Sequence, residues 1–101
     1  MTDAIVCNLE ALTPDERKRA ALLRRAIGEA TLERAELPDG IALRVRCELP
    51  ILAEWIGLER RCCPFLSFEL RWERGEDAPW LELRGPEGTK EFLAREMTTG
   101  G

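Results

Sequence analysis

Two adjacent cysteines, Cys62 and Cys63, are the residues of this chain with the clearest capacity for chemistry. They follow Glu59 in the stretch ERRCCP, so the carboxylate lies about one helical turn before both sulfurs. A disulfide between neighbouring cysteines closes a small strained ring, and such a pair tends to remain a dithiol in a reducing compartment. Soft thiolates select soft or borderline ions, and the candidates are Hg(II), Zn(II), Cu(I) and trivalent arsenic.

Cys7 is the expected third sulfur of such a site. It closely precedes the first predicted helix, on a segment that can fold back over the rest of the domain. Soft ions usually recruit a third or fourth sulfur, and no other cysteine can bring one without disturbing a strand. Cys47 is expected to fill the core instead, because it points inward from a strand about a helix length from Cys62. The predicted metal ligands are therefore Cys7, Cys62 and Cys63, with Glu59 beside them.

A second interpretation treats the cysteine pair as inert core. On a helical wheel Cys62 and Cys63 fall in the apolar arc, and free cysteine is among the most buried residue types. The chain has no C-x-x-C pair, and the C-terminal end of a helix disfavours a thiolate. Glu59 does not fit this interpretation, because it lies in the same arc and is costly there unless something pairs with it. We expect it to face the cysteine pocket, as a ligand or held by an arginine.

Three functions therefore remain open at this point. The first is a soft-metal or metalloid binding protein that uses the cysteine cluster. The second is a thiol-redox protein in which Cys7 forms a reversible disulfide with Cys62 or Cys63. The third is a non-catalytic, self-associating interaction module in which the cysteines are buried and inert.

Composition excludes several other classes. The chain has 101 residues, a net charge of −4 and no histidine or tyrosine, so the commonest general base and the commonest nitrogen ligand are both missing. It also has no G-x-S-x-G or Walker sequence, and we do not expect an enzyme. The negative charge argues against nucleic acid as a partner. We interpret the basic cluster of Arg17, Lys18, Arg19, Arg24 and Arg25 as the solvated face of a helix.

No apolar run approaches the roughly 20 residues of a membrane span, and the N-terminus lacks the features of a secretory signal. We therefore expect a cytoplasmic protein that does not contact membranes. Its length suits one domain, which we assign to residues 1–97, with 98–101 as a frayed tail.

The elements that must position the cysteines can be predicted from periodicity and capping. Thr13, Pro14 and Glu16 form a capping box that starts a helix ending near Gly28. Alternation predicts strands at 41–47, 66–73 and 80–84. Because a turn follows at 37–40, the segment 30–37 is expected to be the hairpin partner of the first of these strands, and the alternative is that it forms the tail of the first helix. Pro50 opens a helix that runs to Cys62 or Cys63, and a last helix follows Gly85 and Pro86.

This order, α-ββα-ββα, predicts an α+β domain: a two-layer sandwich of one four-stranded antiparallel sheet with three helices packed on one face. We expect the strand at 66–73, with Leu66, Phe68, Leu70 and Trp72 facing inward, to contribute the largest share of the core. Trp80 would lie on the other face in a row with Ala42, which suggests a self-association surface and a possible homodimer.

Two motifs also carry a resemblance. The chain combines an N-terminal C-x-L-x-x-L-T-P segment (Cys7 to Pro14) with E-R-R-C-C-P-F (Glu59 to Phe65), and GPEGTKEF follows at 85–92. In these features it resembles a group of small uncharacterised bacterial proteins associated with heavy-metal resistance. The resemblance implies Cys7, Cys62 and Cys63 as candidate ligands, whereas Cys47 lies outside the matching motifs.

Overall fold

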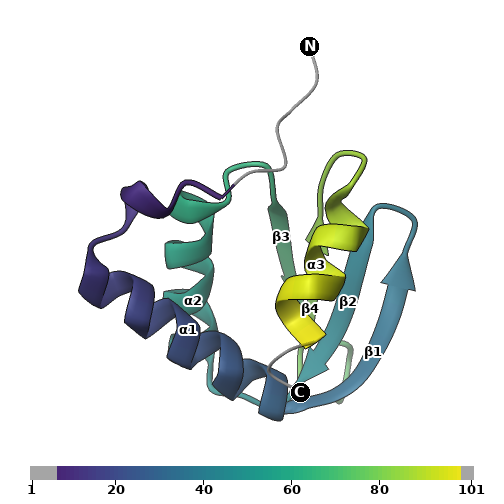
Figure 1. Ribbon diagram of the computed structural model, residues 1–101. Helices are drawn as coiled ribbons and strands as arrows, with labels where there is room; N and C mark the ends of the chain where they lie inside the picture. Colours follow the sequence, from purple (N-terminus) through teal and green to yellow (C-terminus); the bar gives the residue numbers. More distant parts are fainter. Residues whose placement is uncertain (1–6, 99–101) are drawn as a thin grey trace.

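The computed structural model describes residues 7–98, and it confirms the predicted α+β arrangement of three helices and one four-stranded antiparallel sheet (Figure 1). The elements are η1 (Leu9–Ala11), α1 (Pro14–Glu29), β1 (Thr31–Leu37), β2 (Gly40–Val45), α2 (Leu49–Cys62), β3 (Ser67–Arg71), β4 (Trp80–Arg84) and α3 (Thr89–Thr98). Across residues 7–98, no helix combines the length and the apolar character needed to cross a membrane.

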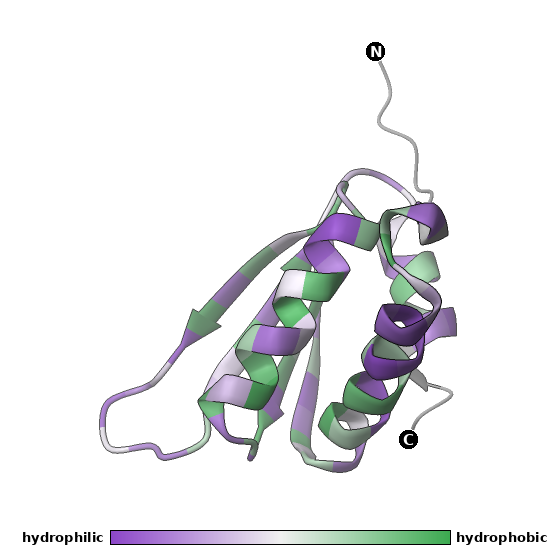
Figure 2. Cartoon of the chain, turned by 90° about the vertical axis from the view of Figure 1, so that its left-hand side faces the viewer, coloured by the Kyte–Doolittle hydropathy of each residue, from purple (hydrophilic) through white to green (hydrophobic). Residues whose placement is uncertain are grey.

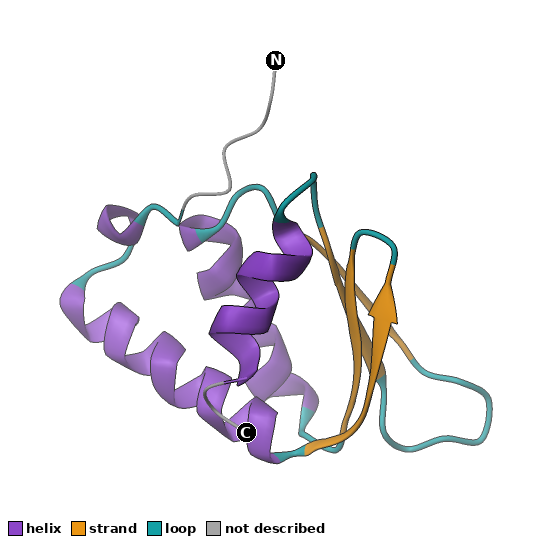
Figure 3. Ribbon diagram, turned by 45° about the vertical axis from the view of Figure 1, so that its right-hand side comes forward, coloured by secondary structure: helices purple, strands orange, loops and turns teal. Residues whose placement is uncertain are grey.

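The sheet consists of two hairpins joined side by side. Its strand order is β1-β2-β4-β3, with every neighbouring pair antiparallel, so β2 and β4 are central and β1 and β3 are edges. All three helices lie on one face of this sheet, as Figure 3 shows with the helices in purple and the strands in orange. No helix or strand of residues 7–98 therefore covers the other face of the sheet.

The core lies between the central strands and the helices. Ile41 pairs with Leu83 and Leu43 pairs with Leu81 across β2 and β4, and all four side chains are buried. The helices are amphipathic, and Figure 2 shows hydrophobic and hydrophilic residues interleaved along each of them. Each helix contributes an apolar stripe to this core, which is the burial that stabilises short helices in water.

The prediction that residues 66–73 form the main core strand is wrong. β3 is an edge strand that ends at Arg71, and Phe68 and Leu70 are only half-buried because one side of their strand has no neighbour. Trp72 was expected to face inward, but it follows the strand and is 47% exposed. The central β4, in which Leu81 and Leu83 are fully buried, contributes more.

Two further boundaries differ from expectation. β2 ends at Val45, so Cys47 lies in the loop before α2 and not on a strand. The last helix starts at Thr89 and not after Pro86, because Gly88 has a φ of 99°, a left-handed conformation that a right-handed helix cannot contain. Thr98 belongs to α3, and the rest of the predicted tail, 99–101, lies outside the described residues.

The outer sheet face is more polar than the sequence suggests. Trp80 lies on it opposite Arg44 and Arg71 and is half-buried, whereas Ala42 is 4% exposed. Glu82 is also buried there, and its carboxylate pairs with Arg71 and with Arg84. Self-association through this face stays a prediction.

Candidate metal centre

Helix α2 sets the positions of Glu59 and Cys62. Pro50 occupies its first turn, where the missing N–H costs no hydrogen bond, and Pro64 follows its end. The buried residues of the helix are Leu52, Trp55, Leu58, Glu59 and Cys62, so Glu59 and Cys62 lie on the buried face as predicted. Cys63 caps the helix, and its N–H donates to the Glu59 carbonyl oxygen at 2.6 Å.

Cys7 reaches the site because the N-terminal segment is fixed to the end of α2. The Asn8 N–H donates to the Cys62 carbonyl oxygen at 2.6 Å, which places Cys7 next to the cysteine pair. The Arg61 guanidinium adds a second attachment, because it donates to the Ala11 carbonyl oxygen at 2.8 Å and to the Glu16 carboxylate at 2.7 Å. The helix end therefore holds the segment that carries the third sulfur.

The three predicted sulfurs lie together. The sulfur atoms of Cys7, Cys62 and Cys63 are all within 4.8 Å of one another, as the sequence-based prediction required. Cys7 and Cys63 are joined by a disulfide with their Cα atoms 4.6 Å apart, and Cys62 is a free, buried thiol. Reduction of this disulfide would leave three thiols in one place, one from the N-terminal segment and two from the end of α2.

Glu59 lies beside the sulfurs but is held by an arginine. Its residue is 4% exposed, and its Oε1 accepts from Arg24 Nη2 at 2.6 Å. Its Oε2 is 3.6 Å from Cys63 Sγ, a hydrogen bond that only the reduced thiol can donate. The disulfide and this hydrogen bond thus belong to two redox states of Cys63. The prediction that Glu59 faces the cysteine pocket and needs an arginine or a metal is met by Arg24.

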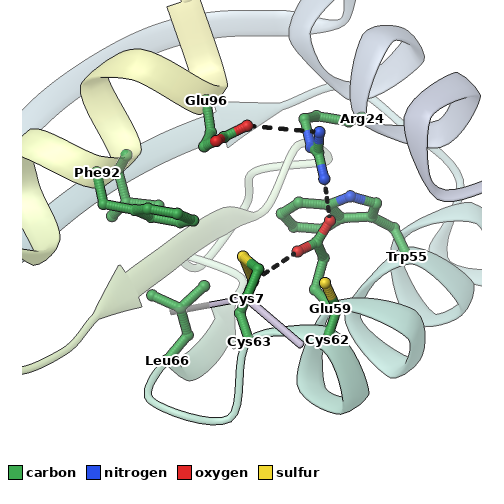
Figure 4. Close-up of a pocket in the computed structure, with 10 residues that line it drawn as sticks. Cys7, Arg24, Trp55, Glu59, Cys62, Cys63, Leu66, Phe92 and Glu96 are labelled. Atoms are coloured by element: carbon green, nitrogen blue, oxygen red, sulfur yellow. Dashed lines mark hydrogen bonds and ion pairs between the residues drawn. A yellow bond between two sulfur atoms is a disulfide. The ribbon is translucent and has the colours of Figure 1, made fainter. Parts of the chain in front are cut away.

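Arg24 corrects the interpretation of the basic cluster. It is half-buried on α1 and bridges Glu59 to α3, where Glu96 lies 3.8 Å from it (Figure 4). The available signal was its position next to Leu23, because a residue that borders the apolar stripe of a helix can reach into the interior. Arg19 is also not simply solvated, since its guanidinium forms a two-point pair with Glu54 at 2.8 Å.

The environment of Cys62 opposes its ionisation. Burial raises the pKa of the Cys62 thiol above its usual value of 9.0, the negative charges of Glu59 and Glu96 raise it further, and Arg24 lowers it in part. The thiol is therefore protonated at neutral pH and a weak nucleophile without a metal ion. A bound cation must displace that proton.

A cavity of about 260 Å³ adjoins the cysteines. Figure 4 shows Phe92 and Leu66 on one side of the cysteines and Trp55 with Glu59 on the other. The lining residues are Cys7, Arg24, Trp55, Glu59, Cys62, Cys63, Leu66, Phe92, Leu93 and Glu96. Sequence reasoning did not identify the contributions of Phe92, Leu93 and Glu96, because only the fold brings α3 over the end of α2.

Cys47 is separate from this group. It is a free, half-buried thiol that packs against the core, and it lines a different hollow between α1 and the start of α2 with Leu22, Leu23 and Ile51. Burial raises the pKa of its thiol as well. Its exclusion from the cluster agrees with the expectation that it fills space.

Comparison of the chain with known protein families, with curated proteins and with solved structures gives no match.

Proposed function

We propose that this protein binds a soft metal or metalloid ion, such as Hg(II) or trivalent arsenic, through Cys7, Cys62 and Cys63 in their reduced form. The observation that carries the proposal is the approach of three sulfurs, from two distant parts of the chain, to within 4.8 Å of one another. Three sulfurs that each lie about 2.3 Å from one ion are about 4 Å apart. A two-coordinate ion between two of them needs about 4.6 Å, so the Cys7 and Cys63 sulfurs must move apart once their disulfide is reduced, while Cys62 already lies within reach.

Glu59 acts in this proposal as a supporting residue. Its Oε1 already accepts a hydrogen bond from Arg24, and its Oε2 lies 3.6 Å from Cys63 Sγ, where it would accept one from that thiol after reduction. A carboxylate in that position orients the sulfur before the metal binds. The ligand set is thus three thiolates with one carboxylate in the surrounding shell.

The disulfide between Cys7 and Cys63 supports a second candidate, a thiol-redox function. In that case Cys7 and Cys63 would cycle between dithiol and disulfide while Cys62 stays nearby as a third thiol. Because the pKa of Cys62 is raised, its thiol is a poor candidate for the thiolate that attacks the disulfide at neutral pH. The metal site and the redox pair would use the same sulfur atoms. The metal site requires Cys63 as a reduced thiol, whereas the redox pair alternates between thiol and disulfide.

Metal titration of the fully reduced protein tests the proposal. Wild type, Cys7→Ser, Cys62→Ser and Cys63→Ser are titrated with Hg(II) or Zn(II), and sulfur-to-metal absorbance is followed. We expect each of the three substitutions to weaken binding more than about 10-fold, because loss of an outer-shell partner alone typically costs 10- to 100-fold. Cys47→Ser is the matched control and should bind like wild type, since Cys47 lines a different hollow.

Equal affinity in wild type and Cys7→Ser would refute the three-sulfur site. The redox candidate then gains support if Cys7 and Cys63 equilibrate with a glutathione buffer within the range of cellular potentials while Cys62→Ser leaves that equilibrium unchanged.

A further inference from the structure

The cavity beside the cysteines is larger than a bare ion needs. An ion held at about 2.3 Å from three sulfurs fits among the sulfur atoms themselves. The adjoining space of about 260 Å³ lies beyond them. An apolar cavity of about 150 Å³ in a protein interior is sufficient to bind benzene, so a phenyl-sized group fits here.

The walls of this cavity divide into an apolar and a charged part. Trp55, Leu66, Phe92 and Leu93 supply apolar surface, and all four side chains are buried. The Phe92 ring is held edge-on by Phe65, with ring centroids 5.1 Å apart. The charged part consists of Arg24 with Glu59 and Glu96, one positive charge beside two negative ones, and Arg24 lies close enough to Glu59 to offset the charge of that buried carboxylate. Hydrocarbon is thus favoured against the apolar part, next to the sulfurs.

We propose that the site accepts a thiophilic centre that carries an organic group, namely an aryl or alkyl compound of trivalent arsenic or of Hg(II). This inference rests on the proposed function and specifies its substrate class. The sulfurs bind the arsenic or mercury atom, and the organic group occupies the cavity against Phe92 and Leu66.

The binding step is an exchange of ligands without a change in oxidation state. An aryl arsenoxide reacts with two thiols to form two arsenic–sulfur bonds and releases one water molecule, which carries off both thiol protons and the oxygen. An organomercury halide reacts with one thiol, forms one mercury–sulfur bond and releases the acid HX. The carbon–metal bond stays intact in both reactions. Cys7 and Cys63 must first be reduced, by a low-molecular-weight thiol or a phosphine reductant in the experiment.

The test compares phenylarsine oxide, a methyl arsenoxide and arsenite on the reduced Cys47→Ser protein. Each affinity is divided by the affinity of the same compound for dithiothreitol, which removes the intrinsic preference of the arsenic atom for thiols. We expect the phenyl compound to bind about 10- to 100-fold more tightly than arsenite on this relative scale, as burial of a phenyl-sized group provides. The methyl compound should fall between them.

Leu66→Phe fills part of the cavity and is expected to lower the phenylarsine affinity at least about 10-fold while arsenite binding stays unchanged. Leu22→Phe, at a position on α1 that is 63% exposed, is the matched control and should alter neither. If Leu66→Phe does not fold, the comparison of the three arsenic compounds on the Cys47→Ser protein still decides the question.

Two results would overturn the inference, and they differ in what else they affect. Binding of arsenite without a relative preference for the phenyl compound contradicts the organic substrate class and leaves the metal site in place. Failure of the reduced protein to bind any of the three compounds contradicts the proposed function itself.

Discussion

Glu59 is the residue that most constrains the interpretation of this site. It is 4% exposed on an otherwise apolar helix face, and among residues 7–98 its carboxylate forms an ion pair with Arg24 alone. The two partners are unequal, because the Arg24 side chain is 30% exposed and can reach water whereas Glu59 cannot. Removal of the arginine leaves a buried charge without compensation, and removal of the carboxylate does not.

This asymmetry predicts different costs for the two substitutions. Arg24→Ala should lower the free energy of unfolding by about 1–3 kcal/mol, less than for a fully buried pair because Arg24 is partly solvated. Glu59→Gln should lower the free energy of unfolding by less. The double variant, Arg24→Ala with Glu59→Gln, should recover most of the stability that Arg24→Ala loses. Arg25→Ala is the control and should change stability by about 0.5 kcal/mol or less, since Arg25 is largely exposed. Urea unfolding measures all four, and additive losses at Arg24 and Glu59 would contradict the buried pair.

The need of Glu59 for a partner could be predicted from the sequence, but the identity of the partner could not. Helical periodicity places the carboxylate on the buried arc, and burial cost then requires a cation or a metal. The choice of Arg24 depends on how α1 packs against α2, which local periodicity does not determine. The same holds for Phe92 and Glu96, which α3 brings to the cavity from the far end of the chain.

At the scale of elements, the junction between η1, α1 and the end of α2 decides whether Cys7 stays at the site. Arg61 contacts both the Ala11 carbonyl oxygen and the Glu16 carboxylate, and Glu16 also completes the capping box with Thr13. One side chain of α2 thus fixes the start of α1 and the segment before it. Capping signals predict where α1 begins, but they do not reveal that its cap is tied to a second helix.

Loss of this junction should weaken the approach of Cys7 to Cys63 without unfolding the domain. We expect Arg61→Ala to lower the equilibrium constant for Cys7–Cys63 disulfide formation in a glutathione buffer by about 3- to 10-fold, because the hydrogen bonds that hold the segment before α1 are lost while solvent screening at this exposed site limits the effect. Arg60→Ala is the neighbouring control, since Arg60 is exposed and forms no hydrogen bond or ion pair with another side chain of residues 7–98. Equal disulfide stability in the two variants would contradict the junction.

The same junction gives a pH dependence with a defined sign. The Arg61 guanidinium and the Thr13 N–H lower the pKa of Glu16 from 4.5 to about 2. A carboxyl whose folded pKa is depressed stabilises the fold above its unfolded pKa and loses that contribution as the pH falls through the folded pKa. The stability difference between wild type and Glu16→Gln should therefore be present at pH 7 and shrink between about pH 4.5 and 2. In an Arg61→Ala background the same difference should be smaller at pH 7, because Arg61 is the largest cause of the shift.

At the scale of the whole molecule, the predicted element order and antiparallel sheet follow from alternation, turns and capping, while the strand order does not. The clearest alternating segment, 66–73, becomes an edge because the chain joins β2 to β4 at the centre of the sheet. Alternation of apolar and polar residues indicates that one face of a strand is buried, but it does not indicate whether the strand has one neighbouring strand or two. Only the assembled fold assigns the main core to β4.

The contact between Cys7 and Cys63 couples the site to the stability of the whole domain. The two residues are 56 positions apart, and closing a loop of that length in the unfolded chain contributes up to about 4 kcal/mol in the chain-entropy model. A metal ion shared by the reduced sulfurs restores part of this effect by mass action, about 2.7 kcal/mol at a concentration 100-fold above its dissociation constant. The redox state of the cysteines and metal binding should thus both shift the folding equilibrium of the domain.

Urea unfolding of six samples checks this coupling: wild type and Cys7→Ser, each oxidised, reduced, and reduced with Zn(II). The oxidised protein should be more stable than the reduced one by about 2–4 kcal/mol, and Zn(II) should recover part of the difference. Cys7→Ser should be insensitive to reductant and gain much less from the metal, because the link across the chain is gone. If Zn(II) stabilised Cys7→Ser as strongly as reduced wild type, the ion would be bound without Cys7, and the coupling between the N-terminal segment and the end of α2 would be refuted.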